Sequence, residues 1–395
     1  MGSKNKKWRF IFNRDHLLIT AGAFILLGVL SFITFNISFL NPIANALKAF
    51  SVTDLFFDIQ HYGKPEESGS IAVIDITDVE SRGDVAAVIE RVVLCNPACV
   101  GVDAIFEGVR SDKEGNAFLM EVVEAYKDDI VFTSKLTDYD SRAGSFTSSV
   151  NSFFVDSLSV REGYANLKNN LDNLPVRELS VRSLLGQDAV LSFPAALVEK
   201  YSGHSLENHG EDWLINYRNV NFRVIAPEDI EEAADFLEGK IVLLGGVREE
   251  RDMYSSPVGK MPGVIIQAHS VDTLLGKEVS YLPSWANWIL AFVLCWLFQV
   301  TVETVSRKAV NGRRVVPYTF LKESCIMPGI TFFVCSAVLC YLAFLLFSKW
   351  GFCIDIAIIL MLFALTLESR KLYRSMIIAL SKRYSCRFLQ KSIYT

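Results

Sequence analysis

The sequence predicts an α/β domain, with a largely parallel sheet covered by helices, joined to α-helical transmembrane segments. Four long apolar runs are almost free of charge, and the stretch between the first two alternates Val/Ile-rich strands with helical spacing. Charge is also divided along the chain. Residues 41–283 carry 39 acidic and 21 basic residues, whereas the remainder carries 5 acidic and 18 basic ones.

The four apolar runs predict transmembrane helices over residues 17–40, 285–302, 327–347 and 350–367. Each is close to the roughly 20 residues that cross the hydrocarbon core of a bilayer as a helix. Helices of a soluble core are usually shorter and carry a polar stripe. The first run is longer than the apolar part of a signal peptide, which favours a retained anchor, although Ala44-Asn45-Ala46 matches a cleavage site.

The basic residues outside the acidic block predict the membrane topology. Five lie in the N-terminal residues 1–16, five between the second and third spans, and seven in the tail, residues 368–395. Short basic loops stay in the cytoplasm. We therefore expect both termini in the cytoplasm, and residues 46–282 as the extracytoplasmic domain.

Two features near the inner and outer membrane faces remain open from sequence. The tail could lie on anionic lipid as an amphipathic helix, dock a partner, or form a partly disordered flank. Trp285, Trp288 and Trp350 are expected at the outer interface, with Trp350 opening the fourth span. Asp355, the sole acid within the spans, is either a functional group or a solvated or helix-paired one.

Within the outer domain, apolar runs and helical spacing predict the order of elements. A Ser/Asp-rich loop is expected over residues 138–152. The expected strands cover residues 70–76, 99–106, 129–136, 212–218 and 240–246, and the expected helices cover residues 84–95, 116–127, 193–203, 227–237 and 262–276. Strands this apolar are typical of a parallel sheet with both faces covered.

The glycine pair Gly245-Gly246 ends an apolar strand, as in a phosphate-binding loop. Such a loop needs a lysine and a hydroxyl to surround phosphate. Here Glu249 and Glu250 follow, and carboxylates repel phosphate. We therefore interpret the pair as a tight exit from the strand, in which glycine permits positive φ.

Two carboxylates interrupt otherwise apolar strands and form the candidate binding site. A buried carboxylate is costly unless it is paired, and ligands of parallel sheets bind beyond the carboxyl ends of the strands. Asp75 and Asp103 could meet there with Gly245, Gly246 and Asp252 to hold a small ligand or an ion. The alternative is that the carboxylates are structural and cap loop amides.

Other residues gave less definite signals. His269, three residues before Asp272, is either a ligand-facing or pH-responsive group or a hydrogen-bonded helix histidine. Cys95 and Cys99 could form a disulfide in an oxidising compartment, or remain two free thiols.

Catalysis finds little support in the sequence. Local signatures of metalloprotease, serine hydrolase and cysteine-dependent sites are missing, as is a metal-binding CxxC spacing, and the chain has only five histidines. We expect no enzyme activity, no metal, no cofactor and no nucleic-acid binding.

Four segments together resemble CHASE2 domains, which are bacterial extracytoplasmic sensory domains held between transmembrane helices. They are "IAVIDITDVE" from residue 71, "NPACVGVDAIFEG" from residue 96, "LINYRNVNFRVIAPEDI" from residue 214, and a final run with the Gly pair, Asp252, Pro257, Pro262-Gly263 and "IIQAHSVDTLL". The resemblance covers residues 70–280.

Two departures from the family pattern qualify the resemblance. The Trp-Pro and Arg usual after the first strand are replaced by "VESRGDVAAV", and no cytoplasmic kinase or cyclase module is recognisable. The resemblance implies a sensor of a small ligand or an envelope protein, a possible homodimer, and output through a separate cytoplasmic or membrane protein. The alternative is a structural or effector subunit of a membrane assembly.

Overall fold

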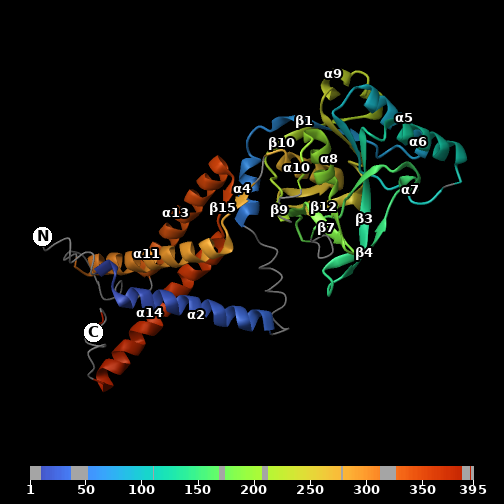
Figure 1. The fold of residues 1–395 in the computed structure, drawn as a ribbon. Coiled ribbons are helices and arrows are strands. Elements are labelled where there is room, and N and C mark those ends of the chain that lie inside the picture. Colours follow the sequence, from blue (N-terminus) through green and yellow to red (C-terminus); the bar gives the residue numbers. More distant parts are fainter. Residues whose placement is uncertain are drawn as a thin grey trace. The chain divides into compact units, whose positions relative to one another are not determined.

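A computed structural model describes residues 10–36, 52–109, 111–168, 174–206, 212–276, 279–311, 326–384 and 392. The chain forms two compact units (Figure 1). We call Thr53–Val279 the sheet unit, and we call Met1–Val52 together with Ser280–Thr395 the helical unit.

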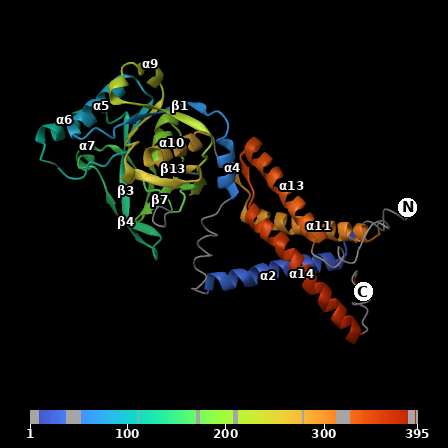
Figure 2. The ribbon, with the colours of Figure 1, turned by 180° about the vertical axis from the view of Figure 1, so that it is seen from behind.

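The sheet unit is built on a nine-stranded sheet whose central strands are parallel (Figure 2). The order is β10-β1-β11-β2-β3-β4-β7-β8, and β5 pairs with β3 in parallel. The strands are β1 (Glu66–Asp75), β2 (Cys99–Val102), β3 (Ile130–Asp140), β4 (Ser145–Val150), β5 (Arg161–Tyr164), β7 (Arg182–Leu185), β8 (Asp188–Leu191), β10 (Val220–Ile225) and β11 (Ile241–Gly245).

The central strands are buried over their whole paired length, as the apolar runs predict. Ile71–Ile74, the four residues of β2 and the five residues of β11 are all buried. Strands of this kind need a covering layer on each face. Helices α5 (Arg82–Leu94) and α6 (Lys113–Tyr126) pack on one face around Ile89, Leu119 and Val123, and α8 (Phe193–Ser202) and α10 (Gly263–Leu274) cover the other.

Local sequence signals account for the helix ends. The Ser81 side chain accepts a hydrogen bond from the Asp84 amide at the start of α5, and Asp112 accepts from the Gly115 amide at the start of α6. Gly203, with φ of 68°, ends α8 in the left-handed conformation that glycine adopts without strain.

Three of the expected elements were wrong in part. Residues 138–152 are not one loop, because β3 continues to Asp140 and β4 follows, with the rings of Tyr139 and Phe146 packed 5.0 Å apart across the hairpin. The expected strand 212–218 is only β9 (Asp212–Leu214), paired with β6 (Glu178–Ser180), and β10 was not expected. The expected helix 227–237 is divided into a 3-10 turn, Pro227–Asp229, and α9 (Ala234–Leu237).

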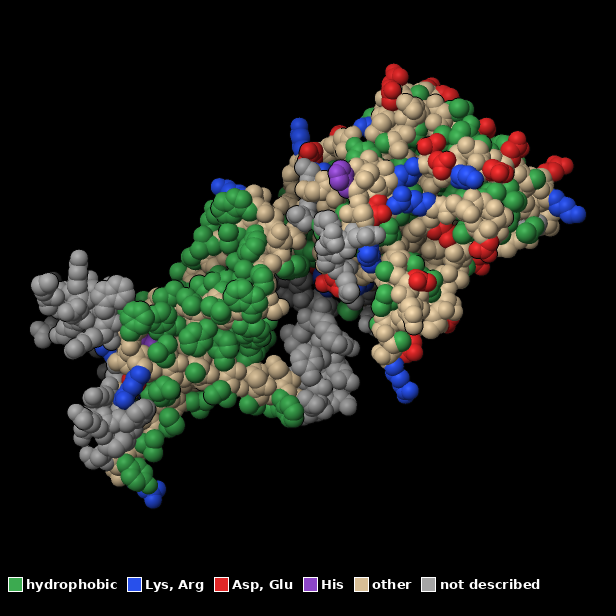
Figure 3. Space-filling view, in the orientation of Figure 1, with side chains coloured by type: hydrophobic (Ala, Val, Ile, Leu, Met, Phe, Trp, Pro, Cys, Tyr) green, Lys and Arg blue, Asp and Glu red, His purple; other side chains and the backbone are tan. Residues whose placement is uncertain are grey.

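The helical unit contains four long helices, α2 (Arg14–Asn36), α11 (Ser284–Asn311), α13 (Ile326–Trp350) and α14 (Ile356–Arg383). Among the described residues, three segments are long and apolar enough to cross a membrane: Arg14–Ile33, Ser284–Arg307 and Ile326–Trp350. Figure 3 shows hydrophobic side chains covering the visible face of this unit. Independently of that view, Phe333, Val338 and Leu342 of α13 are exposed, as expected for a lipid-facing surface.

The fourth predicted span does not begin where we expected. Trp350 closes α13 instead of opening the next helix, and α14 starts at Ile356. Asp355 is the N-cap of α14 and accepts a hydrogen bond from the Ile358 amide, so it is helix-paired. Charged residues interrupt α14 from Glu368 onward, and a fourth crossing stays a prediction.

Polar contacts join three of these helices at the charged end of the unit. Glu303 on α11 accepts hydrogen bonds from Arg307 and from Arg370 of α14, each at 2.9 Å. The Ser369 hydroxyl of α14 donates to the Ile19 carbonyl of α2 at 2.7 Å. The helices are therefore held together by buried hydrogen bonds as well as by apolar packing.

A two-residue strand pair connects the segment that follows the sheet unit to the turn between α13 and α14. β14 (Ser280–Tyr281) pairs in parallel with β15 (Phe352–Cys353). The Ser280 amide donates to the Gly351 carbonyl at 2.8 Å, and the Leu282 amide donates to the Cys353 carbonyl at 3.1 Å. The segment entering α11 is thus also bonded to the turn between α13 and α14.

Candidate functional site

The predicted residues at the carboxyl edge of the sheet lie side by side. Asp75 is in register with Gly245 across β1 and β11. On the other side of β11, the Asp103 amide donates to the Leu244 carbonyl at 2.8 Å. The sheet order therefore places Asp75 and Asp103 on either side of the end of β11, but their environments differ.

Asp75 serves the loops around it. Its carboxylate accepts hydrogen bonds from the Thr77 amide at 3.0 Å, the Val247 amide at 3.2 Å and the Arg248 guanidinium at 2.8 Å. Burial disfavours the charged form, but these hydrogen bonds outweigh it and lower the pKa of Asp75. Of the two interpretations of Asp75, the geometry matches a structural carboxylate that caps loop amides.

The glycine pair has a packing role, and the expected reason for it was wrong. Neither Gly245 nor Gly246 has positive φ. A Cβ on Gly245 would lie 2.7 Å from the Val264 side chain, so this glycine lets α10 approach the sheet. The amides of Val247 and Arg248 are bonded to Asp75 and Thr77, which leaves them engaged within the protein.

Asp103, by contrast, is influenced by the charge of a second carboxylate. Burial, and after it the charge of Asp252, raises the pKa of Asp103 to about 7. Burial also raises the pKa of Asp252, although Asp252 accepts hydrogen bonds from Tyr254 and from the Gly263 amide at the start of α10. The pKa of Tyr254 is raised to about 12, by burial and by the neighbouring Asp252. Carboxyl groups with pKa values raised by burial and like charge are a frequent mark of functional sites.

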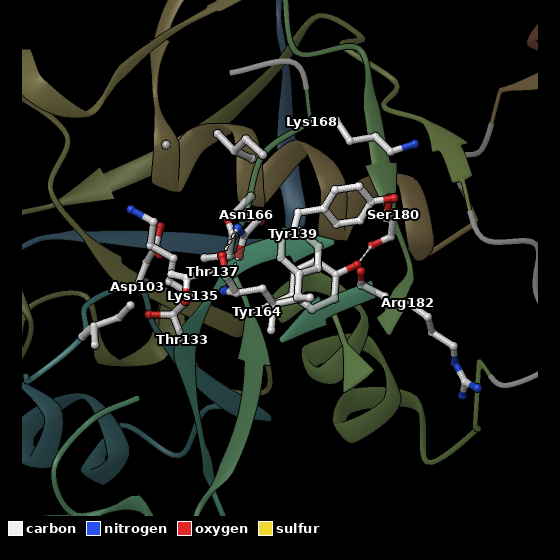
Figure 4. A pocket seen from close by; sticks show the side chains of 18 of the residues that line it. Asp103, Thr133, Lys135, Thr137, Tyr139, Tyr164, Asn166, Lys168, Ser180 and Arg182 are labelled. Carbon is white, nitrogen blue, oxygen red and sulfur yellow. Dashed lines mark hydrogen bonds between the residues drawn. The ribbon is translucent and has the colours of Figure 1, made fainter. Parts of the chain in front are cut away.

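Asp103 and Asp252 line a cavity of about 1200 Å³ in the sheet unit. Its wall includes the loop after β2, the β3–β4 hairpin, the segment after β5, and the first turn of α10. Figure 4 shows Asp103 and Thr133 at one end of the drawn side chains, and Ser180 and Arg182 at the other. The cavity is of the size that holds small-molecule ligands.

Most of the wall was missed by sequence reasoning, because its residues come from segments that are distant along the chain. Tyr164 donates its hydroxyl to the Ser180 carbonyl at 2.8 Å, and Asn166 exchanges two hydrogen bonds of 2.8 Å with the backbone of Leu136. Gln267 of α10 donates to the Ala165 carbonyl at 3.2 Å. These bonds fix the segment after β5 as one wall of the cavity.

The loop after β2 is anchored by Arg82, which the sequence analysis did not single out. Its buried guanidinium donates to the Gly108 carbonyl at 2.8 Å, the Glu107 carbonyl at 2.9 Å and the Asn116 side chain at 2.6 Å. The signal available in the sequence was a cation in the first turn of α5, where the helix dipole disfavours positive charge.

Replacing Arg82 by methionine is expected to loosen this loop. The substitution removes the donors to two carbonyls and one amide oxygen, and we expect a loss of about 2 kcal/mol in the free energy of unfolding. Hydrogen-exchange mass spectrometry of the full-length chain should show faster exchange over residues 103–109. The control is Arg91→Met, which removes the exposed pair with Glu231 and should cost less than about 1 kcal/mol. Equal exchange in both variants would contradict the anchoring role.

His269 lies outside the cavity. It is buried on α10 between the rings of Tyr217 and Phe222, with centroids 5.1 and 4.9 Å away. It bonds to the backbone of Asn216, and burial lowers its pKa to about 3. The structure thus places His269 as a hydrogen-bonded core histidine that stays neutral at physiological pH.

Cys95 and Cys99 are free thiols that face different neighbours, which matches the second of the two interpretations. Cys95 closes α5, and its sulfur approaches the Arg91 carbonyl at 3.3 Å. Cys99 opens β2, and its sulfur lies 3.9 Å from the Leu197 carbonyl on α8. α5 and α8 cover opposite faces of the sheet. Burial raises the pKa of Cys99 to about 12, so this thiol is unreactive.

The described residues contain no group of three or more His, Cys, Asp or Glu side chains arranged to hold a metal ion. The site they do form is a cavity with a pair of carboxylates, aromatic rings and polar groups. Such an arrangement can bind and orient a small polar molecule.

Comparison with protein families assigns these features to a known group. The family model described as "CHASE2 domain" matches residues 24–302. Neither a comparison with curated proteins nor one with solved structures found a match. Because the matched region covers well over half of the chain, the protein belongs to the CHASE2 family of extracytoplasmic sensory domains.

Proposed function

We propose that this protein is a bacterial inner-membrane sensor that binds a small ligand in the cavity of the sheet unit and signals to a separate protein through its helical unit. The single observation that carries the proposal is the cavity of about 1200 Å³ at the carboxyl edge of the sheet, with Asp103 in its wall. Ligands of parallel sheets bind at this edge. The proposal is for binding without catalysis.

The proposed topology has four crossings, with both termini in the cytoplasm. It is supported by the net negative charge of residues 41–283 and the excess of basic residues in the remainder. The exposed apolar side chains of α11 and α13 are suited to contact with lipid.

A ligand-dependent change in the sheet unit has a short covalent path to the membrane. Val279 is the last residue of that unit, and β14 follows immediately. Because β14 is bonded to β15, a displacement of this segment would act on α11 and on the α13–α14 turn together. We expect the output partner to contact the inner ends of these helices, the loop 303–324 or the tail.

The test is a ligand screen by thermal unfolding of the purified full-length chain in detergent, with small cations, anions and neutral polar compounds. Ligands that bind only the folded state stabilise it by mass action, so at least one class should raise the unfolding temperature in a saturable way. A Gly263→Val variant serves as control. Its larger side chain would press on Asp252 and Tyr254, which lie 2.7 and 3.1 Å from a Cβ at this position, and should reduce the effect.

If no class of compound stabilises the chain, the ligand-binding sensor is contradicted and a structural subunit of a membrane assembly becomes the better account. Co-purification from the native host is the second test. A signalling partner should be recovered with the full-length chain in detergent, and the absence of any partner would contradict signalling to a separate protein.

A further inference from the structure

Asp103 and Asp252 both line the cavity, and no cation lies near either carboxylate within the described part of the chain. Burial and the charge of Asp252 raise the pKa of Asp103. Burial and Glu249 raise the pKa of Asp252, and hydrogen bonds from Tyr254 and the Gly263 amide lower it, with a net increase. Neither aspartate forms an ion pair with a described lysine or arginine. A pair of carboxylates in a cavity is costly unless a bound cation or a proton compensates it.

The basic residues of the described cavity wall do not pair with Asp103 or Asp252. Lys168 is neutralised by Asp212 at 2.5 Å and Glu178 at 3.4 Å. Arg182 lies beside Ser180, at the end opposite Asp103 in Figure 4, and Lys135 is exposed on β3. The described wall contains five acidic residues, Asp103, Glu107, Asp138, Asp212 and Asp252, against these three basic ones. The described part of the cavity wall therefore carries more acidic than basic residues.

The two acids pack closely against glycine residues. Gly263 has no side chain, and a Cβ there would collide with the Asp252 carboxylate, 2.7 Å away. On the neighbouring strand, a Cβ on Gly245 would approach Asp103 to 3.4 Å. Tyr254 adds an aromatic ring and a hydroxyl to the same wall. The two glycines thus let the backbone of β11 and α10 lie close to both acids.

We propose that the cavity recognises a small organic amine, whose protonated nitrogen lies between the carboxylates of Asp103 and Asp252. The N–H groups of an ammonium ion donate to the two carboxyl groups, and these hydrogen bonds are strongest when the carboxyl groups are ionised. A divalent metal is a poorer occupant, because the described residues offer no group of three metal-ligating side chains. This inference rests on the proposed function and specifies its ligand.

Binding of an amine must compete with binding of a proton at Asp103. The pKa of Asp103 is raised to about 7, by burial and by Asp252, whereas an aliphatic amine stays protonated at this pH. Raising the pH from 6 to 8 ionises Asp103 and strengthens amine binding by about tenfold. The titratable groups beside Asp103 are Asp252, whose pKa is raised by burial, and Tyr254, whose pKa is raised to about 12 by burial and by Asp252.

The test uses three four-carbon probes of similar length on the full-length chain in detergent: putrescine, 1,4-butanediol and succinate. Isothermal titration calorimetry should show binding of putrescine, with affinity about tenfold higher at pH 8 than at pH 6. Asp103→Asn should weaken putrescine at least tenfold and abolish the pH dependence. Since ionised Asp103 opposes Asp252 in the folded state, this variant should be at least as stable as the parent chain at pH 8. Asp188→Asn, an exposed acid on β8, should leave binding unchanged.

The outcomes separate the ligand class from the function. Saturable binding of succinate or butanediol without putrescine would overturn the amine site and leave a ligand-binding sensor standing. Putrescine binding that is unaffected by Asp103→Asn and Asp252→Asn would place the amine elsewhere and also overturn the proposal. If none of the probes binds, the amine site is overturned. The broader ligand screen described above then tests whether the protein is a ligand-binding sensor.

Discussion

Replacing Glu303 by glutamine is expected to lower the unfolding temperature of the full-length chain in detergent by roughly 5–10 °C. Glu303 is buried, and its two oxygens bind Arg307 and Arg370, so the substitution removes the carboxylate that joins α11 to α14. Removing one partner of a buried pair costs about 3–5 kcal/mol, because the other charge stays buried. Arg307 is 44% exposed, so most of the loss should come from Arg370, and we expect about 3 kcal/mol.

The matched control is Glu368→Gln on α14. Its pair with Lys371 is exposed, at 59% and 51% of the two side chains, and exposed pairs contribute less than about 1 kcal/mol. Differential scanning fluorimetry of both variants should show a large shift for the first and almost none for the second. Similar shifts for both would contradict a buried ionic contact between α11 and α14.

Replacing Gly163 by alanine is expected to destabilise the sheet unit by about 3 kcal/mol. A Cβ on this residue of β5 would lie 2.6 Å from the Phe193 Cα and 2.7 Å from the Phe193 nitrogen. These are backbone atoms at the start of α8, which is itself bonded into the fold, so they cannot move aside as a flexible side chain does. Overpacking of this kind costs about 1–3 kcal/mol or more.

Gly69→Ala on β1 is the control, because nothing lies within 4 Å of a Cβ there. Resistance of the sheet unit to proteolysis across a urea series measures the difference. The Gly163 variant should become susceptible at lower urea concentration than the parent chain, and the Gly69 variant should not. If the two glycine variants are equally resistant, β5 and α8 are not in the close contact described.

The parallel sheet and its covering helices could be predicted because both produce a recognisable pattern of apolar residues over a short stretch of sequence. Continuous apolar runs such as Ile241–Leu244 are stable only when buried on both faces, and the spacing of Val85, Val88, Ile89 and Val92 places one face of a helix on the sheet. β4 and β10 carry a weaker signal. Phe146 pairs with Leu185, and Phe222 packs on His269, so both side chains depend on partners that lie far away in the sequence.

The candidate site was only half accessible to sequence reasoning. Placing Asp75, Asp103 and Gly245 at one edge follows from the rule that parallel strands end together. His269 shares the last helix with residues of the site wall, yet it points into the core between aromatic rings. A residue's place in the sequence therefore selected the right helix and the wrong side of it.

The class of the fold, the apolar helices and the separation of charge could be predicted from the sequence alone, because hydrophobic periodicity and charge are properties of neighbouring residues. Which aspartate is structural and which lines the cavity depends on contacts that exist only in the folded chain. Asp75 is satisfied by Val247 and Arg248, 172 and 173 residues along the chain. Asp103 instead lines the cavity, where burial and the charge of Asp252 raise its pKa. The ionisation of a carboxyl group depends on the charges and donors within a few ångströms, and folding alone brings those together.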